Sequence, residues 1–185
     1  MGKIADGLEA ADRNVFTRPI PKSAGARMRF LVRQAKGSTK AVARRLGVSQ
    51  RTVQRYVAGQ RKHPPKALAE ALEREVRKEW QPRVRRRAEK RAATSTGIAV
   101  EARARFGFTA APGSTDDGRM RRITQQLPPV YARRLFDARA AGASERELRD
   151  IVAEGLQEVY FKDGGRRAPG LVVEFTDIDY VEMSY

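Results

Sequence analysis

Several features that other protein classes require are missing from this chain of 185 residues. It contains no Cys, which excludes disulfides, thiol nucleophiles and cysteine-bound zinc. Its single His leaves little material for a Ser-His-Asp hydrolase or a histidine-rich metal site. No apolar run approaches the roughly eighteen residues of a membrane-spanning helix, and the first residues lack the apolar core of a signal peptide. We therefore expect a soluble cytoplasmic protein.

Negative charge is missing from one part of the chain. The net charge is +16, and residues 1–100 hold 25 basic and 8 acidic residues, whereas residues 101–185 hold 13 and 14. Between Asp12 and Glu70 there are 15 Lys or Arg and no acidic residue. Such a surface repels itself unless a polyanion lies against it, and nucleic acid is the obvious one. A generally Arg-rich composition would carry interspersed acids, so the acid-free window favours nucleic-acid binding.

The spacing of residues 38–59 predicts a helix-turn-helix. Val42 and Leu46 lie one helical turn apart and would face a core, and Gly47 permits the left-handed backbone of a tight turn. Ser49 would cap the next helix. In such a motif the second helix enters the major groove of DNA. A plain αα-hairpin inside an all-helical core is the alternative.

Side chains on the second helix are candidates for reading bases, because Arg pairs with guanine and Gln with adenine in bidentate fashion. These candidates are Ser49, Gln50, Arg51, Gln54 and Arg55.

Other basic residues near the motif are candidates for contacts to phosphates. They are Lys40, Arg44, Arg45, Arg61 and Lys62. Residues 83–91 form a further basic run that includes Arg85, Arg86 and Arg87. This run is either a helix along the phosphate backbone or a solvated linker, and the sequence favours neither.

The pattern changes near Thr94, where apolar and polar residues begin to alternate with a period of two. Residues 98–108 and 120–127 are expected to form a hairpin around a loop at 110–118. Two helices should follow, the second opened by a capping box of Ser144 and Glu147. A final strand should run from about residue 171 to 180.

The resulting order is ββααβ, which predicts a small α+β domain with an antiparallel sheet. The expected fold class is therefore α+β with two domains. Residues 1–93 would form an all-α helix-turn-helix domain with a basic helical linker, and residues 94–185 the α+β domain.

Hydroxyls stand beside carboxylates in the hairpin loop, at Ser114, Thr115, Asp116 and Asp117. Taken alone, this pattern is typical of a polar turn. Asp177 and Asp179 lie two residues apart, which indicates an exposed strand face more than a metal-binding pair. We expect no metal site and no cofactor belonging to this chain itself.

Four stretches carry a resemblance to a known family. They are Phe16–Met28, the helix-turn-helix, Arg105–Asp117 and Glu174–Tyr180. Together they resemble the telomere terminal proteins (Tpg type) of linear actinomycete chromosomes and plasmids, and the likeness covers essentially the whole chain.

This resemblance implies a protein that binds telomeric DNA and primes the synthesis that patches its ends. A Thr hydroxyl accepts the first deoxynucleotide in place of a 3′-OH, and the protein stays attached to the 5′ end. Carried onto this sequence, the acceptor is Thr115, with Ser114 as the alternative. Asp116 and Asp117 would support it, by imitating primer phosphates or by helping to hold a metal.

The implied partners are telomeric DNA, a telomere-associated protein and a DNA polymerase, and the protein would be associated with the nucleoid at DNA ends. Mg²⁺ and the deoxynucleotide come with the polymerase, so the chain is expected to be an acceptor more than an enzyme. The competing hypothesis is a transcriptional regulator whose C-terminal domain dimerises or senses a ligand. A third is a nuclease or recombinase that uses Asp177 and Asp179.

Overall fold

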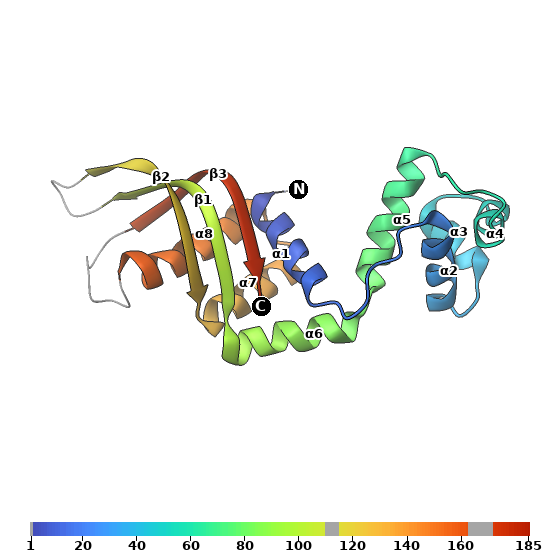
Figure 1. The fold of residues 1–185 in the computed structure, drawn as a ribbon, viewed down its shortest axis with the longest axis horizontal. Coiled ribbons are helices and arrows are strands. Elements are labelled where there is room, and N and C mark those ends of the chain that lie inside the picture. Colours follow the sequence, from blue (N-terminus) through green and yellow to red (C-terminus); the bar gives the residue numbers. More distant parts are fainter. Residues whose placement is uncertain (1, 110–114, 163–171) are drawn as a thin grey trace. The chain divides into compact units, whose positions relative to one another are not determined.

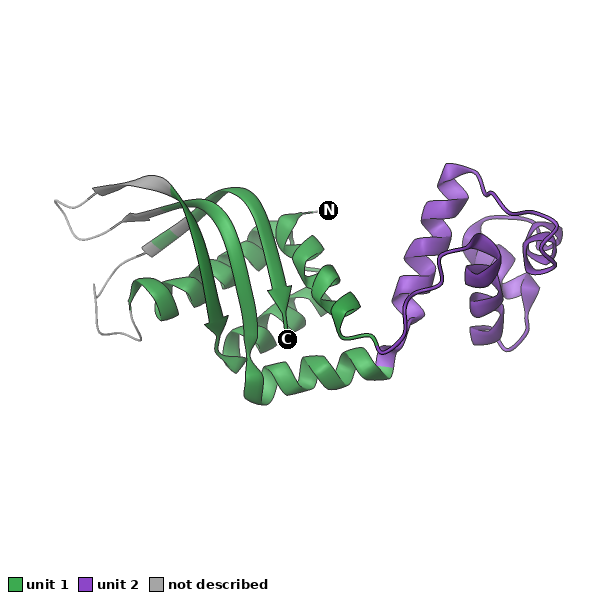
Figure 2. Cartoon of the chain, in the orientation of Figure 1, with its two compact units in different colours: residues 1–16, 83–185 green, residues 17–82 purple. Residues whose placement is uncertain are grey.

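A computed structural model describes residues 2–109, 115–162 and 172–185 (Figure 1). The chain forms two compact units, unit 1 with residues 1–16 and 83–185 and unit 2 with residues 17–82 (Figure 2). This division differs from the expected boundary at residue 93. The first helix and the basic run belong to unit 1 because Ile4, Leu8, Ala11 and Ala92 are buried in its core.

Unit 2 is built from four helices. They are α2 (Ala24–Gln34), α3 (Thr39–Leu46), α4 (Gln50–Val57) and α5 (Lys66–Glu79). A Ser side chain caps each of the first three, at Ser23, Ser38 and Ser49, by accepting a hydrogen bond from a backbone N–H three residues later. Gly47 ends α3 with φ 66°, the left-handed conformation predicted for the turn.

The core of unit 2 joins all four helices. It contains Met28 and Leu31 of α2, Val42 of α3, Val53 of α4 and Leu72 of α5. The expected helix-turn-helix is therefore present, and its two helices are fixed by packing against α2 and α5.

Unit 1 is a three-stranded antiparallel sheet with helices. Its strands, in the order β2-β1-β3, are β1 (Ile98–Thr109), β2 (Thr115–Leu127) and β3 (Val172–Ser184). Its helices are α1 (Lys3–Asn14), α6 (Pro82–Arg91), α7 (Pro129–Ala140) and α8 (Glu145–Leu156), with π-helical turns η1 (Ala92–Thr96) and η2 (Gln157–Phe161). The predicted ββααβ order and the Ser144 capping box are confirmed.

One face of the sheet packs into the core of unit 1. Helices α7 and α8 cover one face of the sheet (Figure 1). Val100, Ala102 and Ala104 of β1 are buried in the same core cluster as Leu135 of α7 and Leu148 of α8. Helix α1 packs against β3, and the approach is close at Gly7, where an added Cβ would lie 3.1 Å from the Val181 carbonyl oxygen. Among the described residues, no helix is long and apolar enough to cross a membrane.

Candidate nucleic-acid interface

Charge is divided unevenly within unit 2. Its residues include 17 Lys or Arg and four Glu, and all four Glu belong to α5. Helices α2, α3 and α4 carry basic residues and no acidic ones. The positive charge is therefore concentrated on the elements that form the helix-turn-helix.

The acidic residues of α5 form ion pairs with neighbouring cations. Hydrogen bonds from Lys78, at 2.9 Å, and from Arg45 hold the pKa of Glu75 below its usual value. Arg45 also pairs with Glu79. The structure thus places Arg45, a predicted phosphate contact, between two carboxylates of α5 that already neutralise its charge.

Helix α4 has one buried and one exposed side. Val53 and Tyr56 are fully buried, whereas Gln50, Arg51 and Gln54 are exposed. Three of the five predicted base readers therefore share the exposed side of the first turns.

The remaining two predicted base readers differ from these three. Arg55 is half-buried. The Ser49 hydroxyl accepts from the Thr52 amide at 3.2 Å and lies 2.9 Å from the Thr52 hydroxyl, so it serves mainly as the helix cap.

One hydrogen bond joins the first residues of α3 and α4. Gln50 Nε2 donates to Thr39 Oγ1 at 2.9 Å. This contact restricts the Gln50 side chain at the start of α4. The sequence analysis did not single out Thr39. Its position directly after Ser38, the N-cap of α3, was the available signal, because it places Thr39 at the first residue of a helix.

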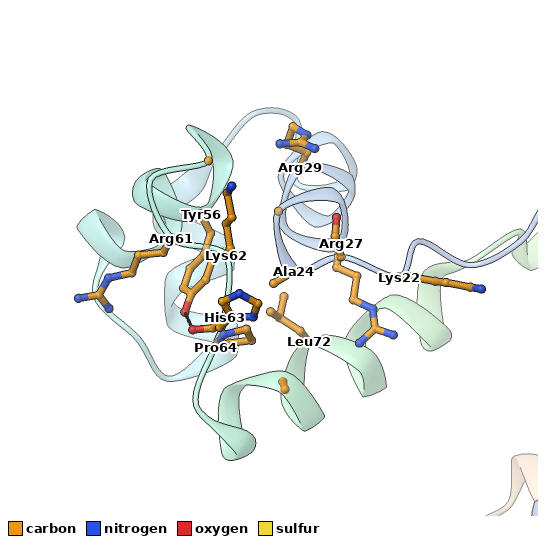
Figure 3. Close-up of a pocket in the computed structure, with 14 residues that line it drawn as sticks. Lys22, Ala24, Arg27, Arg29, Tyr56, Arg61, Lys62, His63, Pro64 and Leu72 are labelled. Carbon is orange, nitrogen blue, oxygen red and sulfur yellow. Dashed lines mark hydrogen bonds between the residues drawn. The ribbon is translucent and has the colours of Figure 1, made fainter.

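A cavity of about 580 Å³ lies between the start of α2, the residues that follow α4, and α5 (Figure 3). Tyr56 Oη donates to the His63 carbonyl oxygen at 3.3 Å, and Arg29 Nη1 donates to the Val57 carbonyl oxygen at 3.3 Å. Arg61 and Lys62, predicted as phosphate contacts, line this cavity together with His63. The sequence did not indicate that they would meet α2.

The basic run 83–91 lies within helix α6, where Ala88 is buried. Arg85 lies 3.8 Å from Glu89 and 3.9 Å from Asp12, whereas Arg86 and Arg87 are exposed. The segment is therefore helical, its contact with phosphates stays a prediction, and Arg85 takes part in ion pairs of unit 1.

The predicted acceptor Thr115 is the first residue of β2 and pairs with Thr109 of β1. The strand begins five residues before the expected Met120, because the ladder with β1 continues past a register shift between Phe106 and Phe108. Asp116 and Asp117 therefore belong to the strand and not to the loop, a correction to the expectation. Ser114 lies outside the described residues.

Asp177 and Asp179 lie in β3 and are exposed. They pair with Arg105 and Arg103, each at 3.0 Å, which confirms the exposed strand face. In the ranges that the structure describes, no group of three or more His, Asp or Glu is placed to hold a metal ion.

Residues 31–79 match the helix-turn-helix family HTH_3, a stretch that runs from within α2 to the end of α5. No curated protein and no solved structure matches the chain. The match confirms the motif and supports DNA binding by unit 2.

Proposed function

We propose that unit 2 binds duplex DNA with the first turns of α4 in the major groove. The observation that carries this proposal is the exposed row of Gln50, Arg51 and Gln54 on a helix whose opposite side is buried. Gln and Arg are the side chains that pair with adenine and guanine edges in bidentate fashion. The acid-free surface around them supplies the attraction to phosphates.

Lys40, Arg44, Arg61 and Lys62 hold the phosphates beside this helix. All four are exposed and belong to the acid-free part of unit 2. Arg45 is left out because two Glu of α5 neutralise it. Arg86 and Arg87 of α6 are exposed and add a second basic segment.

Binding by fluorescence anisotropy tests this assignment, after selection of preferred sites from a random duplex library. Arg51→Ala should cost about 1–3 kcal/mol on the selected site and relax its sequence preference. Arg44→Gln should weaken all sequences alike and lower the salt slope by about one. Arg74→Gln is the matched control, since Arg74 is an exposed cation on α5. Equal losses for all three variants would contradict the proposal.

For the whole chain, we propose the role of a terminal protein that accepts the first deoxynucleotide on Thr115 and stays on the 5′ end of telomeric DNA. This rests on the resemblance of four stretches to the telomere terminal proteins. It is supported by the place of Thr115 in the last pair of the β1–β2 ladder, at the first residue of β2.

The chemistry requires a polymerase as partner. The Thr115 oxygen forms a bond to the α-phosphorus of a deoxynucleoside triphosphate, the bond to pyrophosphate breaks, and the hydroxyl proton passes to water. A Thr hydroxyl is a weak nucleophile, so the polymerase supplies the activation with its Mg²⁺. Asp116 and Asp117 lie beside the acceptor in the strand. A telomere-associated protein is the further expected partner.

A Tyr hydroxyl could act as the acceptor in place of Thr115, at Tyr160, Tyr180 or Tyr185, but two of these hydroxyls are occupied. Tyr180 Oη donates to Glu101 at 2.8 Å, and Tyr185 Oη donates to Asp12. Burial and this second bond raise the pKa of Tyr185, so its oxygen is held as a neutral donor. Tyr160 is exposed, so it is the competing acceptor to test. A nucleotide bound to a Tyr oxygen would resist alkali, whereas one bound to Thr115 would be released.

The deciding experiment incubates the protein with DNA ends, polymerase, Mg²⁺ and a labelled deoxynucleotide, followed by a denaturing gel. Label should appear on the protein, be released by alkali, and be lost in Thr115→Ala. Thr109→Ala, the strand partner of that position, is the matched control and should keep the label. Absence of label on the wild type, with DNA binding intact, would favour a helix-turn-helix regulator, which the HTH_3 match fits equally.

A further inference from the structure

The cavity beside α4 has an apolar floor. Ala24, Tyr56 and Leu72 are 8%, 1% and 0% exposed and line it together with Pro64. The one hydroxyl on this floor, that of Tyr56, is occupied by the His63 carbonyl. The floor therefore suits a flat and largely apolar group better than a phosphate.

The opening of the same cavity is basic. Lys22, Arg29 and Lys62 line it with His63, and none of its lining residues is acidic. Figure 3 shows Lys62 and His63 on one side and Arg29 on the other. Among the described residues, Lys62 forms no ion pair with an acidic side chain, so its ammonium group can bind a phosphate.

Two other cavities lack this combination. The one at Trp80 contains Glu79, and the one along α1 and the sheet contains Asp6, Glu101 and Glu182. Acidic residues at those openings would repel an anion. Of these three cavities in the described part of the chain, the one beside α4 combines an apolar floor with an opening of one charge.

We propose that this cavity, the α2–α4 pocket, binds one unstacked nucleotide, with the base against the floor beside His63 and the phosphate at Lys62 and Arg29. Its volume of about 580 Å³ lies in the range of small-molecule sites. Paired bases inside a duplex offer no free face, so a base reaches the floor only when it is unpaired. Stacking on an aromatic ring stabilises such a base without regard to sequence, and His63 is the exposed aromatic ring of this pocket, since Tyr56 is buried.

Two sources can supply this nucleotide, an unpaired residue of the bound DNA or a free deoxynucleotide. The first source rests on the proposed DNA binding through α4, since the pocket begins where that helix ends. The second source does not depend on it. The experiment therefore has one arm for each.

The first arm compares a blunt duplex with the same duplex carrying one unpaired 3′ nucleotide, by anisotropy at fixed salt. The unpaired nucleotide should tighten binding about tenfold. Lys62→Gln should abolish this preference, and Lys66→Gln, an exposed cation four residues away that does not line the pocket, should keep it. Ala69→Met, which fills the pocket without a change of charge, should also abolish it, with circular dichroism as the check on folding.

The second arm titrates deoxyadenosine monophosphate into the full chain and follows backbone amide shifts by NMR. Shifts confined to the pocket residues, lost in Lys62→Gln and kept in Lys66→Gln, support the proposal with a free nucleotide as source. The proposal is overturned if the two duplexes bind equally and the mononucleotide shifts no pocket residue. It is also overturned if Lys66→Gln behaves like Lys62→Gln in both arms.

The proposed function fails in a different way. In that case the blunt duplex would not bind, or binding would be unaffected by Arg51→Ala. Neither result bears on the mononucleotide titration, so the two failures are distinguishable.

Discussion

The carboxylate of Asp12, in α1, accepts a hydrogen bond from the hydroxyl of Tyr185, 173 residues further along the chain. Arg139 of α7 donates to the same carboxylate at 3.2 Å and to Glu89 of α6 at 2.6 Å. Asp12 is only 7% exposed, so these partners supply the hydrogen bonds that water would otherwise make to its carboxylate. The cluster joins three helices of unit 1 to the residue that follows β3.

Tyr185→Phe should destabilise unit 1 by about 1–2 kcal/mol, because it leaves one lone pair of a buried carboxylate without its donor. The measurement is chemical unfolding monitored by hydrogen exchange, which reports on unit 1 and unit 2 separately. Tyr160→Phe removes the hydroxyl of an exposed Tyr and should change little. If both substitutions have the same effect, the Asp12 contact contributes nothing to stability.

The Tyr185 hydroxyl also predicts a response to alkaline pH. Its pKa is raised by burial and by Asp12. A raised folded-state pKa means that the contribution to stability is complete below the ordinary value near 10 and falls as pH rises above it. The stability of unit 1 should therefore decline above about pH 10 in the wild type, and less steeply in Tyr185→Phe.

Glu75→Gln tests how the stability of unit 2 depends on pH in the acidic range. Hydrogen bonds from Lys78 and Arg45 lower the pKa of Glu75. A lowered pKa means that its contribution to stability is present above the ordinary value of about 4.5 and is lost as pH falls below it. The free energy of unfolding of unit 2 should therefore fall more steeply from about pH 6 to about pH 3 in the wild type than in Glu75→Gln. Glu70→Gln, at an exposed position, should leave the wild-type slope unchanged.

Thr39→Val should weaken selected-site DNA binding by about 2- to 10-fold, since it removes the acceptor of the Gln50 amide. The loss should fall on the base pair that Gln50 reads and spare non-specific binding. Thr39→Ser keeps the hydroxyl and should restore the preference. A uniform loss on all sequences would assign Thr39 to phosphate contact and not to the positioning of Gln50.

Gly97→Ala should prevent unit 1 from folding. Gly97 has φ 71°, and a Cβ there would lie 2.0 Å from the Leu127 carbonyl oxygen. Gly142 has φ 78° and open space around it, so Gly142→Ala should cost only about 1 kcal/mol. Circular dichroism and hydrogen exchange of the two variants measure the difference. A folded unit 1 in Gly97→Ala would show that β1 and β2 can shift at this point.

Local signals predicted much of the fold. The Ser49 cap, the Gly47 turn and the Ser144 capping box each act over three or four residues, and all were correct. The period-two pattern predicted β1, whereas the start of β2 at Thr115 was missed because Asp and Gly in the segment are typical of turns. The ladder with β1 outweighed that preference.

The sequence by itself determined the helix-turn-helix and the concentration of positive charge around it, because both depend on residues close together in the chain. Tertiary structure alone decided that α1 packs in unit 1, that Arg45 is neutralised by α5, that Thr39 holds Gln50, and that Lys62 and His63 meet α2. These contacts join residues 11 or more positions apart, and the packing of apolar faces, which no local pattern encodes, brings them together.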